Sequence, residues 1–368
     1  MSIGRLFGNL RAAGLALTIV VTATAACGGG GGGGGGTSNT PCSSSSSAKW
    51  TAAQINAKTA PYHIDPVYDV PKGLTNCTIG FINPGKSIPF FQTWSAAMHA
   101  AAALYGVNFV EDDVKLKYEN EATSFQTMSV QNLAVVGAHP GNPALLAATQ
   151  SAKVPLITID ATVQGNPYSI GVPNQDVGAG AGQKLVAAAK DKLAGAWNGK
   201  TLDFVGLSAG GCQPCDDRIN SGKAAVQGPL SIADSNVIVS EKTGTPTDSQ
   251  NVMTNILTAH PKDVFVIVPL NDETAVGALH ALDGAHRLGD ALIVTLGDDK
   301  LGRDALRDPN YNNTLLGGYD FNPYGEAWDL IAAAVAIARG DKFKPYQVKV
   351  FLTPSTVNNS YPLPDNGV

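Results

Sequence analysis

Short apolar runs alternate with longer amphipathic stretches along most of the chain. The short runs are rich in β-branched residues and are bounded by turn residues, a pattern typical of buried strands. They predict strands at 78–82, 107–110, 133–136, 154–159, 168–171, 201–205, 237–240, 264–268, 291–296 and 314–316.

Between most of these runs, apolar positions recur at helical spacing. The expected helices are 90–105, 124–131, 143–152, 177–193, 216–230, 249–260, 273–288 and 324–339. Continuously apolar strands separated by helices require crossover connections, and therefore parallel sheets covered on both faces. The number of strands exceeds what one such sheet holds comfortably. We therefore expect an α/β fold with two lobes.

The first unit of this alternation, residues 78–105, contains the most informative loop. A strand at 78–82 is followed by turn residues at 83–88 and by an alanine-rich helix. In open α/β sheets, the loop at the carboxyl end of a strand borders the ligand crevice. Residues in a position to meet a small molecule are Asn83, Lys86, Ser87, Phe90 and Phe91.

The charge balance narrows the class of partner. The 368 residues include 25 Lys and Arg against 30 Asp and Glu, for a net charge of −5, and the body of the chain has no basic cluster. Because phosphate binding needs concentrated Lys and Arg, this balance argues against nucleic acid. A small molecule is the better expectation.

The first residues resemble a bacterial lipoprotein signal. Arg5 and Arg11 bracket a positively charged N-terminal region. Residues 12–26 form an apolar run that is short for a membrane span, and small residues precede Cys27. In such signals the cysteine becomes the lipidated first residue of the mature protein. Thr24 stands where they usually carry Leu, so an ordinary secretory signal is the alternative. Either way, we expect residues 1–27 to direct export.

Two low-complexity stretches follow. An unbroken glycine run and a Ser/Thr-rich segment occupy residues 28–47, and neither can bury apolar surface. We expect this segment to tether a globular part to a membrane. Residues 48–73, with one short helical pattern at 51–59, are expected to pack on the surface as an N-terminal extension.

Apart from Cys27, the cysteines number four: Cys42, Cys77, Cys212 and Cys215. An even number in an exported chain favours disulfides. A zinc site needs about four ligands, and no second CxxC motif or nearby histidine supplies them. The CxxC pair also follows a strand in mid-chain, where a thioredoxin-like motif is not expected. We favour a structural disulfide between Cys212 and Cys215 over a redox role, with Cys42 and Cys77 as a pair that pins the N-terminal segment.

From Leu74 onward the order of motifs resembles the periplasmic sugar-binding proteins of the ribose-binding type, the extracytoplasmic receptors of ABC importers. The motifs are IPFF at 88–91, GNPAL at 141–145, PLITID at 155–160, NDE at 271–273 and GD at 297–298. Each motif is weak by itself, but their order and spacing together are specific.

The resemblance implies a periplasmic binding protein type I fold, with two Rossmann-like lobes that close on a ligand by hinge motion. The chain would cross between the lobes near Pro173, at 319–321 and at 344–347. One lobe would comprise residues 74–172 and 322–343. The other would comprise residues 174–318 and 348–368. The protein would be a monomer without a cofactor or a metal ion.

The implied ligand is a sugar or polyol, which needs polar groups for its hydroxyls and aromatic rings for its C–H faces. Asp160, Phe90 and Phe91 would hold it from one lobe. Arg218, Asn271 and Asp298 would hold it from the other. The complete expected set is Asn83, Lys86, Phe90, Phe91, Trp94, Asp160, Asn174, Arg218, Asn271, Asp298 and Tyr319.

Several of these residues have a purely structural interpretation. One of the two phenylalanines is expected to be ordinary core. Asp160 can simply tie a loop, and the pair at 271–272 can cap the following helix. We expect Asn271 to face the cleft while Asp272 holds the turn.

The chain also departs from the family pattern. Ala161 stands where many sugar binders of this type have Arg, Pro173 replaces an Asp, and Tyr319 and Asp320 occupy a region where Gln is common. These differences predict a ligand other than ribose or a common hexose. Lys86 and Trp94 would then select another polyol or an acidic ligand.

Two other functions compete with import. The sequence GLSAG at 206–210 matches the nucleophile elbow of a serine hydrolase, with Ser208 followed by acidic residues and histidines in the order of that class. However, an elbow runs directly into a helix, whereas residues 210–214 intervene here. The candidate partners are Asp263, Asp272, His280 and His286.

The other competitor is a sensing receptor that presents the same fold to a membrane signalling protein. Sequence does not separate this role from delivery to an ABC permease. A DNA-binding repressor is disfavoured because an export signal stands where a helix-turn-helix would be. We therefore predict a non-catalytic receptor tethered at a membrane.

Overall fold

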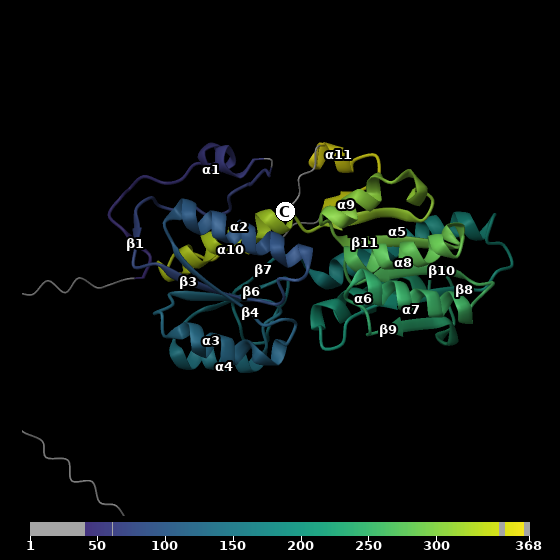
Figure 1. Ribbon diagram of the computed structural model, residues 1–368, viewed down its shortest axis with the longest axis horizontal. Coiled ribbons are helices and arrows are strands. Elements are labelled where there is room, and N and C mark those ends of the chain that lie inside the picture. The colour runs from purple at the N-terminus through teal and green to yellow at the C-terminus, as the bar shows by residue number, and fades with distance from the viewer. Residues whose placement is uncertain (1–40, 61, 346–349, 364–368) are drawn as a thin grey trace, which may run out of the picture. The chain divides into compact units, whose positions relative to one another are not determined.

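The structure is a computed structural model that describes residues 41–60, 62–345 and 350–363 (Figure 1). The expected signal peptide, Cys27 and residues 28–40 of the expected tether lie outside these ranges, as does part of the third expected crossing. Within the described ranges, no helix combines the length and apolarity needed to cross a bilayer.

The first sheet has five strands in the order β4-β3-β5-β6-β7, all parallel. Strand β3 places Ile79 beside Phe109 of β4 on one side and Val135 of β5 on the other. The sequence prediction of a parallel sheet is confirmed here. The strands are β3 (Thr78–Asn83), β4 (Asn108–Asp113), β5 (Val135–Ala138), β6 (Leu156–Ile159) and β7 (Ser169–Ile170).

Helices cover both faces of this sheet (Figure 1). On one face Phe81 packs in a core with residues of α2 (Pro89–Tyr105) and α10 (Pro323–Ala338). On the other face Ile82 packs with residues of α3 (Glu121–Ser129) and α4 (Pro143–Ala152). Neighbouring residues of one strand thus enter two different cores, which explains why the strand is continuously apolar.

The second sheet has six strands in the order β13-β12-β11-β10-β8-β9. Five are parallel, but β13 pairs antiparallel with β12, with Leu352 opposite Gly318. The predicted parallel sheet is thus confirmed for five strands, and the edge strand β13 is the antiparallel addition. The strands are β8 (Leu202–Leu207), β9 (Val237–Ser240), β10 (Val264–Pro269), β11 (Ala291–Gly297), β12 (Leu315–Asp320) and β13 (Val350–Leu352).

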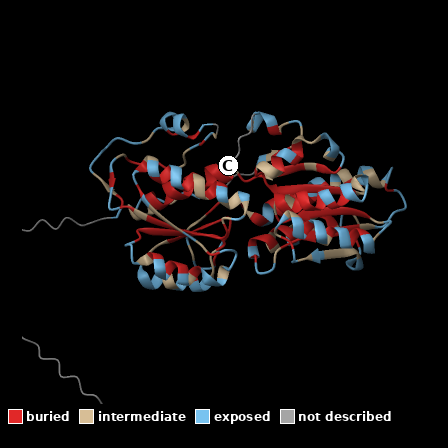
Figure 2. Cartoon of the chain, viewed as in Figure 1, coloured by how far each residue is buried: buried red, intermediate tan, exposed pale blue. Residues whose placement is uncertain are grey.

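The second lobe also has one hydrophobic core on each face of its sheet. Phe204 packs with residues of α5 (Asn174–Leu193) and α6 (Gln213–Gln227). Val205 packs on the opposite face with residues of α7 (Pro246–Ala259), α8 (Asp272–Gly284) and α9 (Lys300–Arg307). Figure 2 shows the inner strands of both sheets buried, whereas the edge strand β9 and the outer helix surfaces are intermediate or exposed.

Two helices of this lobe were not expected from the sequence. Helix α9 carries few apolar residues, and only its last turn buries a large one, Leu306. Helix α11 (Val357–Ser360) is a single turn that buries Val357. Helix α9 has too few apolar residues, and α11 is too short, for apolar periodicity to be visible. The short 3-10 turns are η1 (Tyr118–Asn120), η2 (Asp234–Asn236), η3 (Leu288–Asp290) and η4 (Pro309–Tyr311).

The chain passes from the first sheet to the second between β7 and α5, and returns between β12 and α10. These passages fall at 171–173 and 321–322, close to the predicted crossings. Helix α5 starts at Asn174, three residues earlier than its apolar pattern indicates. Because residues 174–176 are Asn, Gln and Asp, this first turn lacks the apolar side chains on which the prediction relied.

The N-terminal extension is attached to the first lobe, and so are residues 42–44, which the sequence pattern predicted as part of the tether. A disulfide joins Cys42 to Cys77, and β1 (Ser43–Ser44) pairs antiparallel with β2 (Leu74–Thr75). After α1 (Ala52–Thr59), the ring of Tyr62 stacks on Tyr324 of α10 with centroids 4.1 Å apart. Aromatic contact as well as the disulfide therefore holds this extension in place.

Candidate functional site

A cavity of about 220 Å³ lies at the carboxyl ends of strands from both sheets. Phe90, Phe91 and Asp160 line it from the first lobe, and Arg218 and Asn271 line it from the second. All five were expected from the sequence as ligand-binding residues. The structure thus brings together residues that are up to 181 positions apart, from Phe90 to Asn271.

Aromatic rings form one wall of the cavity. Phe90 and Phe91 meet edge to face with centroids 5.8 Å apart, and Phe321 lies 6.3 Å from Phe90. Trp94 is fully buried behind the two phenylalanines, 5.1 and 5.2 Å from their rings. Because Trp94 supports the wall without lining the cavity, the expectation that it meets the ligand is not realised here.

His139 joins this wall and was not expected from the sequence. Its Nδ1 lies 2.7 Å from the main-chain oxygen of Ile159, which can only accept, so Nδ1 carries the hydrogen. Burial lowers the pKa of His139 to about 4, and the ring is neutral at neutral pH. Its Nε2 is therefore left with a lone pair that can accept a hydrogen bond.

Asp160 is the carboxylate of the first lobe. It follows β6 with a left-handed φ of 52°, and its Oδ1 accepts a hydrogen bond of 2.7 Å from the main-chain nitrogen of Val172. A Cβ on Gly171 would lie 2.3 Å from that same Oδ1, so only glycine fits there. Burial and the nearby Asp160 raise the pKa of Glu326 well above its usual value. Glu326 therefore holds a proton beside Asp160.

Arg218 is the cation of the second lobe. Its Nε donates to Oδ1 of Asn174 at 2.6 Å, and its guanidinium also donates to the main-chain oxygen of Leu270 at 2.8 Å. The guanidinium lies 4.7 Å from the ring centre of Phe321. Burial lowers its pKa and Asp160 opposes that change. Arginine keeps its charge even so, and Arg218 faces the cavity with its orientation fixed.

Asn271 begins helix α8. Its Oδ1 accepts from the main-chain nitrogen of Thr274 at 3.0 Å, and Thr274 bonds back in a capping box. Asp272 also lines the cavity, and its carboxylate accepts from the main-chain nitrogen of Asp299 at 2.8 Å and from the hydroxyl of Thr295. Asn271 therefore both caps the helix and lines the cavity, so its two possible roles are compatible, and the cap itself is Asn271 and not Asp272.

Two expected residues of the first loop are engaged elsewhere. Asn83 is fully buried and donates to Glu111 at 2.9 Å and to the main-chain oxygen of Phe91. Lys86 pairs with the same Glu111 at 2.5 Å. Neither lines the cavity. Both side chains hold the loop that carries the aromatic wall, and their partner could not be read from the sequence.

Three further expected residues lie off the cavity wall. Asn174 lines a neighbouring cavity and acts on the site through Arg218. Asp298 is fully buried, with both carboxyl oxygens lacking a hydrogen-bond partner, and burial raises its pKa well above the usual value. Tyr319 packs against Phe351 with ring centres 5.1 Å apart. Loop position alone does not reveal these tertiary contacts.

The Cys212–Cys215 disulfide forms part of the second lobe's wall. Both cysteines are buried and pack against Leu270 and Ala209. Because the pair begins helix α6, it also sets the direction of the helix that carries Arg218. The sequence predicted this disulfide but not its place beside the cavity. Other lining residues that sequence reasoning missed are Tyr118, Thr243, Thr245, Asp248 and Phe321.

The hydrolase interpretation fails at Ser208. The side chain is fully buried, and its hydroxyl donates to Oδ1 of Asp216 at 3.0 Å. A nucleophilic serine needs a basic acceptor, usually histidine, and an open approach for the substrate. Ser208 has neither an exposed hydroxyl nor a histidine acceptor.

Comparison with known proteins gives one family. Residues 79–342 match the family described as periplasmic binding protein domain. The ribose import binding protein of Salmonella typhimurium is 27% identical over 245 residues, which cover 65% of this chain and 78% of that protein. Its counterpart from Escherichia coli is 26% identical over 249 residues, with the same coverage of both chains.

Solved structures show the same fold. A solute-binding protein of an ABC transporter from Actinobacillus succinogenes, with bound D-allose, has a TM-score of 0.64 at 17% identity. It covers 77% of this chain and 99% of its own. Another from Mycobacterium smegmatis, with bound glycerol, has a TM-score of 0.66 at 19% identity and covers 79% of this chain and 99% of its own.

Proposed function

We propose that this chain, which belongs to the periplasmic binding protein domain family, captures a small sugar or polyol between its lobes and delivers it to an ABC importer. The family is one of binding proteins, and this member is not an enzyme. The observation that carries the proposal is a single cavity lined by an aromatic wall from one lobe and by fixed polar groups from both.

The chemistry of the lining suits a polyhydroxylated ligand. The rings of Phe90, Phe91 and Phe321 can cover C–H faces, because an aromatic face is apolar. Asp160 and Nε2 of His139 can accept hydrogen bonds from hydroxyls, while Arg218 can donate to them. Alternating donors and acceptors beside rings are what a sugar requires.

Charge and size restrict the ligand further. Arg218 and Asp160 offset each other, and burial raises the pKa of Asp272, which also lines the cavity, to about 7. A neutral ligand therefore fits better than an ion.

Pockets for drug-sized ligands measure roughly 300–1,000 Å³, and about 220 Å³ suits a smaller molecule. Related structures hold D-allose and glycerol, both small and neutral.

Binding would favour the arrangement in which both lobes contact the ligand. A ligand shifts a conformational equilibrium only by its differential affinity for the two states. Asp160 and Arg218 come from different lobes, so a ligand that bridges them has this differential affinity. The ligand-bound arrangement is then the form that a permease recognises.

A screen for binding tests this proposal. The purified full-length chain is heated with individual sugars, polyols and small acids, and any ligand that raises the melting temperature is titrated by calorimetry. A ligand that binds only the folded state must raise its stability. We expect one neutral polyol or sugar to bind in a 1:1 ratio and to be recovered unchanged. An anionic ligand alone, or turnover of the ligand, would contradict the proposal.

Attachment to a membrane is the finer part of the proposal. It rests on Cys27 after an apolar stretch and on the glycine run that follows. In bacteria fed a labelled fatty acid, the wild-type chain should incorporate label and sediment with membranes. Cys27→Ser should abolish both, whereas Cys42→Ser should leave labelling intact. A wild-type chain that is exported without label would favour a simple secretory signal, and label that survives Cys27→Ser would exclude Cys27 as the lipidated residue.

A further inference from the structure

A second group of polar side chains lies at the amino ends of strands β8 and β10. The cavity lies at the opposite, carboxyl ends of the strands of this sheet. Asp203 is near the amino end of β8, His260 follows the last residue of α7, and Asp263 directly precedes β10. The cavity residues Leu270 and Asn271 follow the carboxyl end of the same β10. The length of a strand therefore separates this group from the proposed ligand site.

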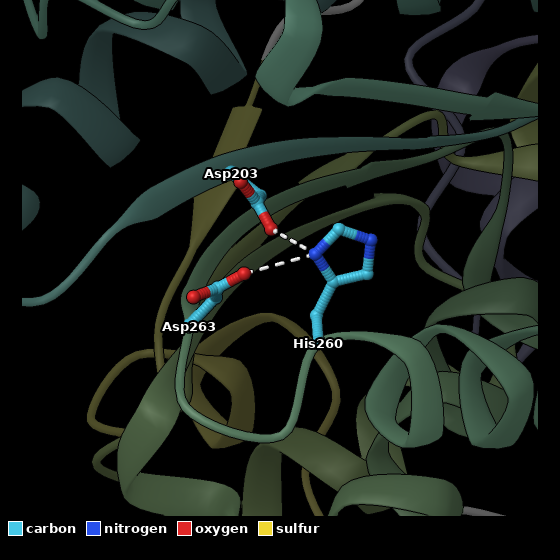
Figure 3. A group of neighbouring side chains, drawn as sticks. All are labelled: Asp203, His260 and Asp263. Atoms are coloured by element: carbon cyan, nitrogen blue, oxygen red, sulfur yellow. Dashed lines mark hydrogen bonds and ion pairs between the residues drawn. The ribbon is translucent and has the colours of Figure 1, made fainter.

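The three side chains converge on one point (Figure 3). Nδ1 of His260 lies 3.0 Å from Oδ2 of Asp203 and 2.9 Å from Oδ2 of Asp263. Each residue offers one ligand atom, and all three atoms lie within 4.8 Å of one another. Two carboxyl oxygens thus face the same ring nitrogen.

A single hydrogen cannot satisfy this arrangement. A ring nitrogen carries one hydrogen at most, and Nδ1 of His260 can direct it to Asp263 at 2.9 Å. Oδ2 of Asp203 then has no hydrogen-bond partner, although Asp203 is fully buried. A buried carboxyl oxygen without a partner is costly. A cation held between the three ligand atoms would give this oxygen a partner.

We propose that Asp203, His260 and Asp263 bind a divalent transition-metal ion, with Zn²⁺ as the best fit. One imidazole nitrogen and two carboxylate oxygens are ligands that Zn²⁺ accepts, whereas Ca²⁺ and Mg²⁺ require more oxygens. Bonds of about 2.0–2.2 Å at tetrahedral angles put ligand atoms roughly 3.3–3.5 Å apart. The observed distances of 2.9 and 3.0 Å need to open by only a few tenths of an ångström.

Neighbouring residues hold all three ligand residues in place. Asn236 donates to Oδ1 of Asp203 at 2.8 Å, which leaves Oδ2 directed at His260. Arg287 donates to the main-chain oxygen of His260 at 2.9 Å and to that of Asp263. The positive charge of Arg287 is paired with Asp290 at 2.9 Å, so it does not offset the two carboxylates of the site.

An ion can reach this site from solvent. The side chains of His260 and Asp263 are 31% and 23% exposed, whereas that of Asp203 is 1% exposed. Water can complete a tetrahedral set from the exposed side. The bound ion would join α7 and the start of β10 to β8, and its role would be to stabilise the second lobe.

Calorimetric titration of the full-length, untagged chain with ZnCl₂, after treatment with a chelator, tests this inference. We expect one equivalent to bind, the melting temperature to rise, and MgCl₂ to have no comparable effect. His260→Gln and Asp263→Asn alter half-exposed positions and should each weaken binding at least tenfold. Asn236→Ala keeps all three ligands but frees Asp203, and should weaken binding by about ten- to a hundredfold.

A matched control is His63→Gln. His63 lies 3.1 Å from Asp65 in an exposed pair with 72% and 92% of the side chains accessible, and no second carboxylate completes that pair. This variant should bind Zn²⁺ like the wild type. Absence of saturable binding would overturn the inference, as would binding that persists in both His260→Gln and Asp263→Asn. Circular dichroism of each metal-free variant shows whether it is folded, and a folded variant that has lost only Zn²⁺ binding supports the site.

Discussion

The guanidinium of Arg218 donates a 2.6 Å hydrogen bond to the carboxamide oxygen of Asn174. Asn174 donates in turn to the main-chain oxygen of Asp160 at 2.7 Å. Because Asn174 is the first residue of α5 after the chain leaves the first sheet, this relay joins the cation of one lobe to the carboxylate loop of the other. The orientation of the Arg218 guanidinium is thus coupled to the backbone at the first passage between the lobes.

Asn174→Ala should therefore destabilise the fold and weaken ligand binding. Nε of the buried Arg218 would lose its partner, and such a group costs about 1–3 kcal/mol. Urea unfolding should show that loss, and calorimetry should show weaker binding. Asn198 lies on an exposed turn, and Asn198→Ala should change the free energy of unfolding by less than about 0.5 kcal/mol. Equal stabilities of the two variants would show that the relay is unimportant.

Phe91→Ala should lower ligand affinity by about tenfold or more. The variant removes a ring from the cavity wall, and an aromatic contact contributes about 0.5–1.5 kcal/mol beyond its buried area. Phe109 provides the control because it is similarly half-buried but packs on His99 away from the cavity. Titration of both variants with the same ligand should show a loss only for Phe91→Ala. An equal loss for both would point to a general effect on folding.

The two disulfides should differ in their contribution to stability. Cys42–Cys77 spans 35 positions and Cys212–Cys215 spans 3. Loop-closure entropy predicts a loss of about 4 kcal/mol without the first and about 2 kcal/mol without the second. Only the second lines the cavity, so replacing that pair by serines should also weaken ligand binding. Unfolding in denaturant and calorimetry measure the two effects. The reverse order of stability would rule out loop closure as the main cause.

Asp329 should make the protein less stable as the pH rises. Burial raises its pKa to about 8, against 3.8 for an ordinary aspartate, so the folded state holds a proton that the unfolded chain releases. The unfolded state therefore binds fewer protons between about pH 4 and pH 8, and the free energy of unfolding falls across this window. The slope from one such group is at most about 1.4 kcal/mol per pH unit.

Asp329→Asn removes this proton and should make the pH dependence shallower. Asp272, with a pKa raised to about 7, remains and acts in the same direction, so part of the slope persists. Urea unfolding from pH 5 to pH 8 should find the variant more stable than the wild type at the upper end. The exposed Asp191→Asn serves as the control. A slope unchanged by Asp329→Asn would show that this carboxyl is ionised in the folded protein.

The sequence by itself determined the alternation of strands and helices and the division into two sheets. These features follow from local periodicity, because a strand buried on both faces must be continuously apolar and a covering helix must be amphipathic. The apolar pattern located all ten of the expected strands to within a few residues. It also placed Phe90, Phe91, Asp160 and Asn271 near a crevice, because strand ends mark that edge of a parallel sheet, whereas Arg218 was expected from the family resemblance.

Only the tertiary structure decided which polar residues reach the cavity. Lys86 follows the first strand just as Asp160 follows β6, yet Glu111 of a neighbouring strand pairs with Lys86. Asp298 also follows a strand, but it is fully buried. His139 lines the cavity in an orientation fixed by its hydrogen bond to Ile159, a residue 20 positions away. Such pairings depend on contacts between distant segments, and these contacts exist only once the sheets and helices have packed together.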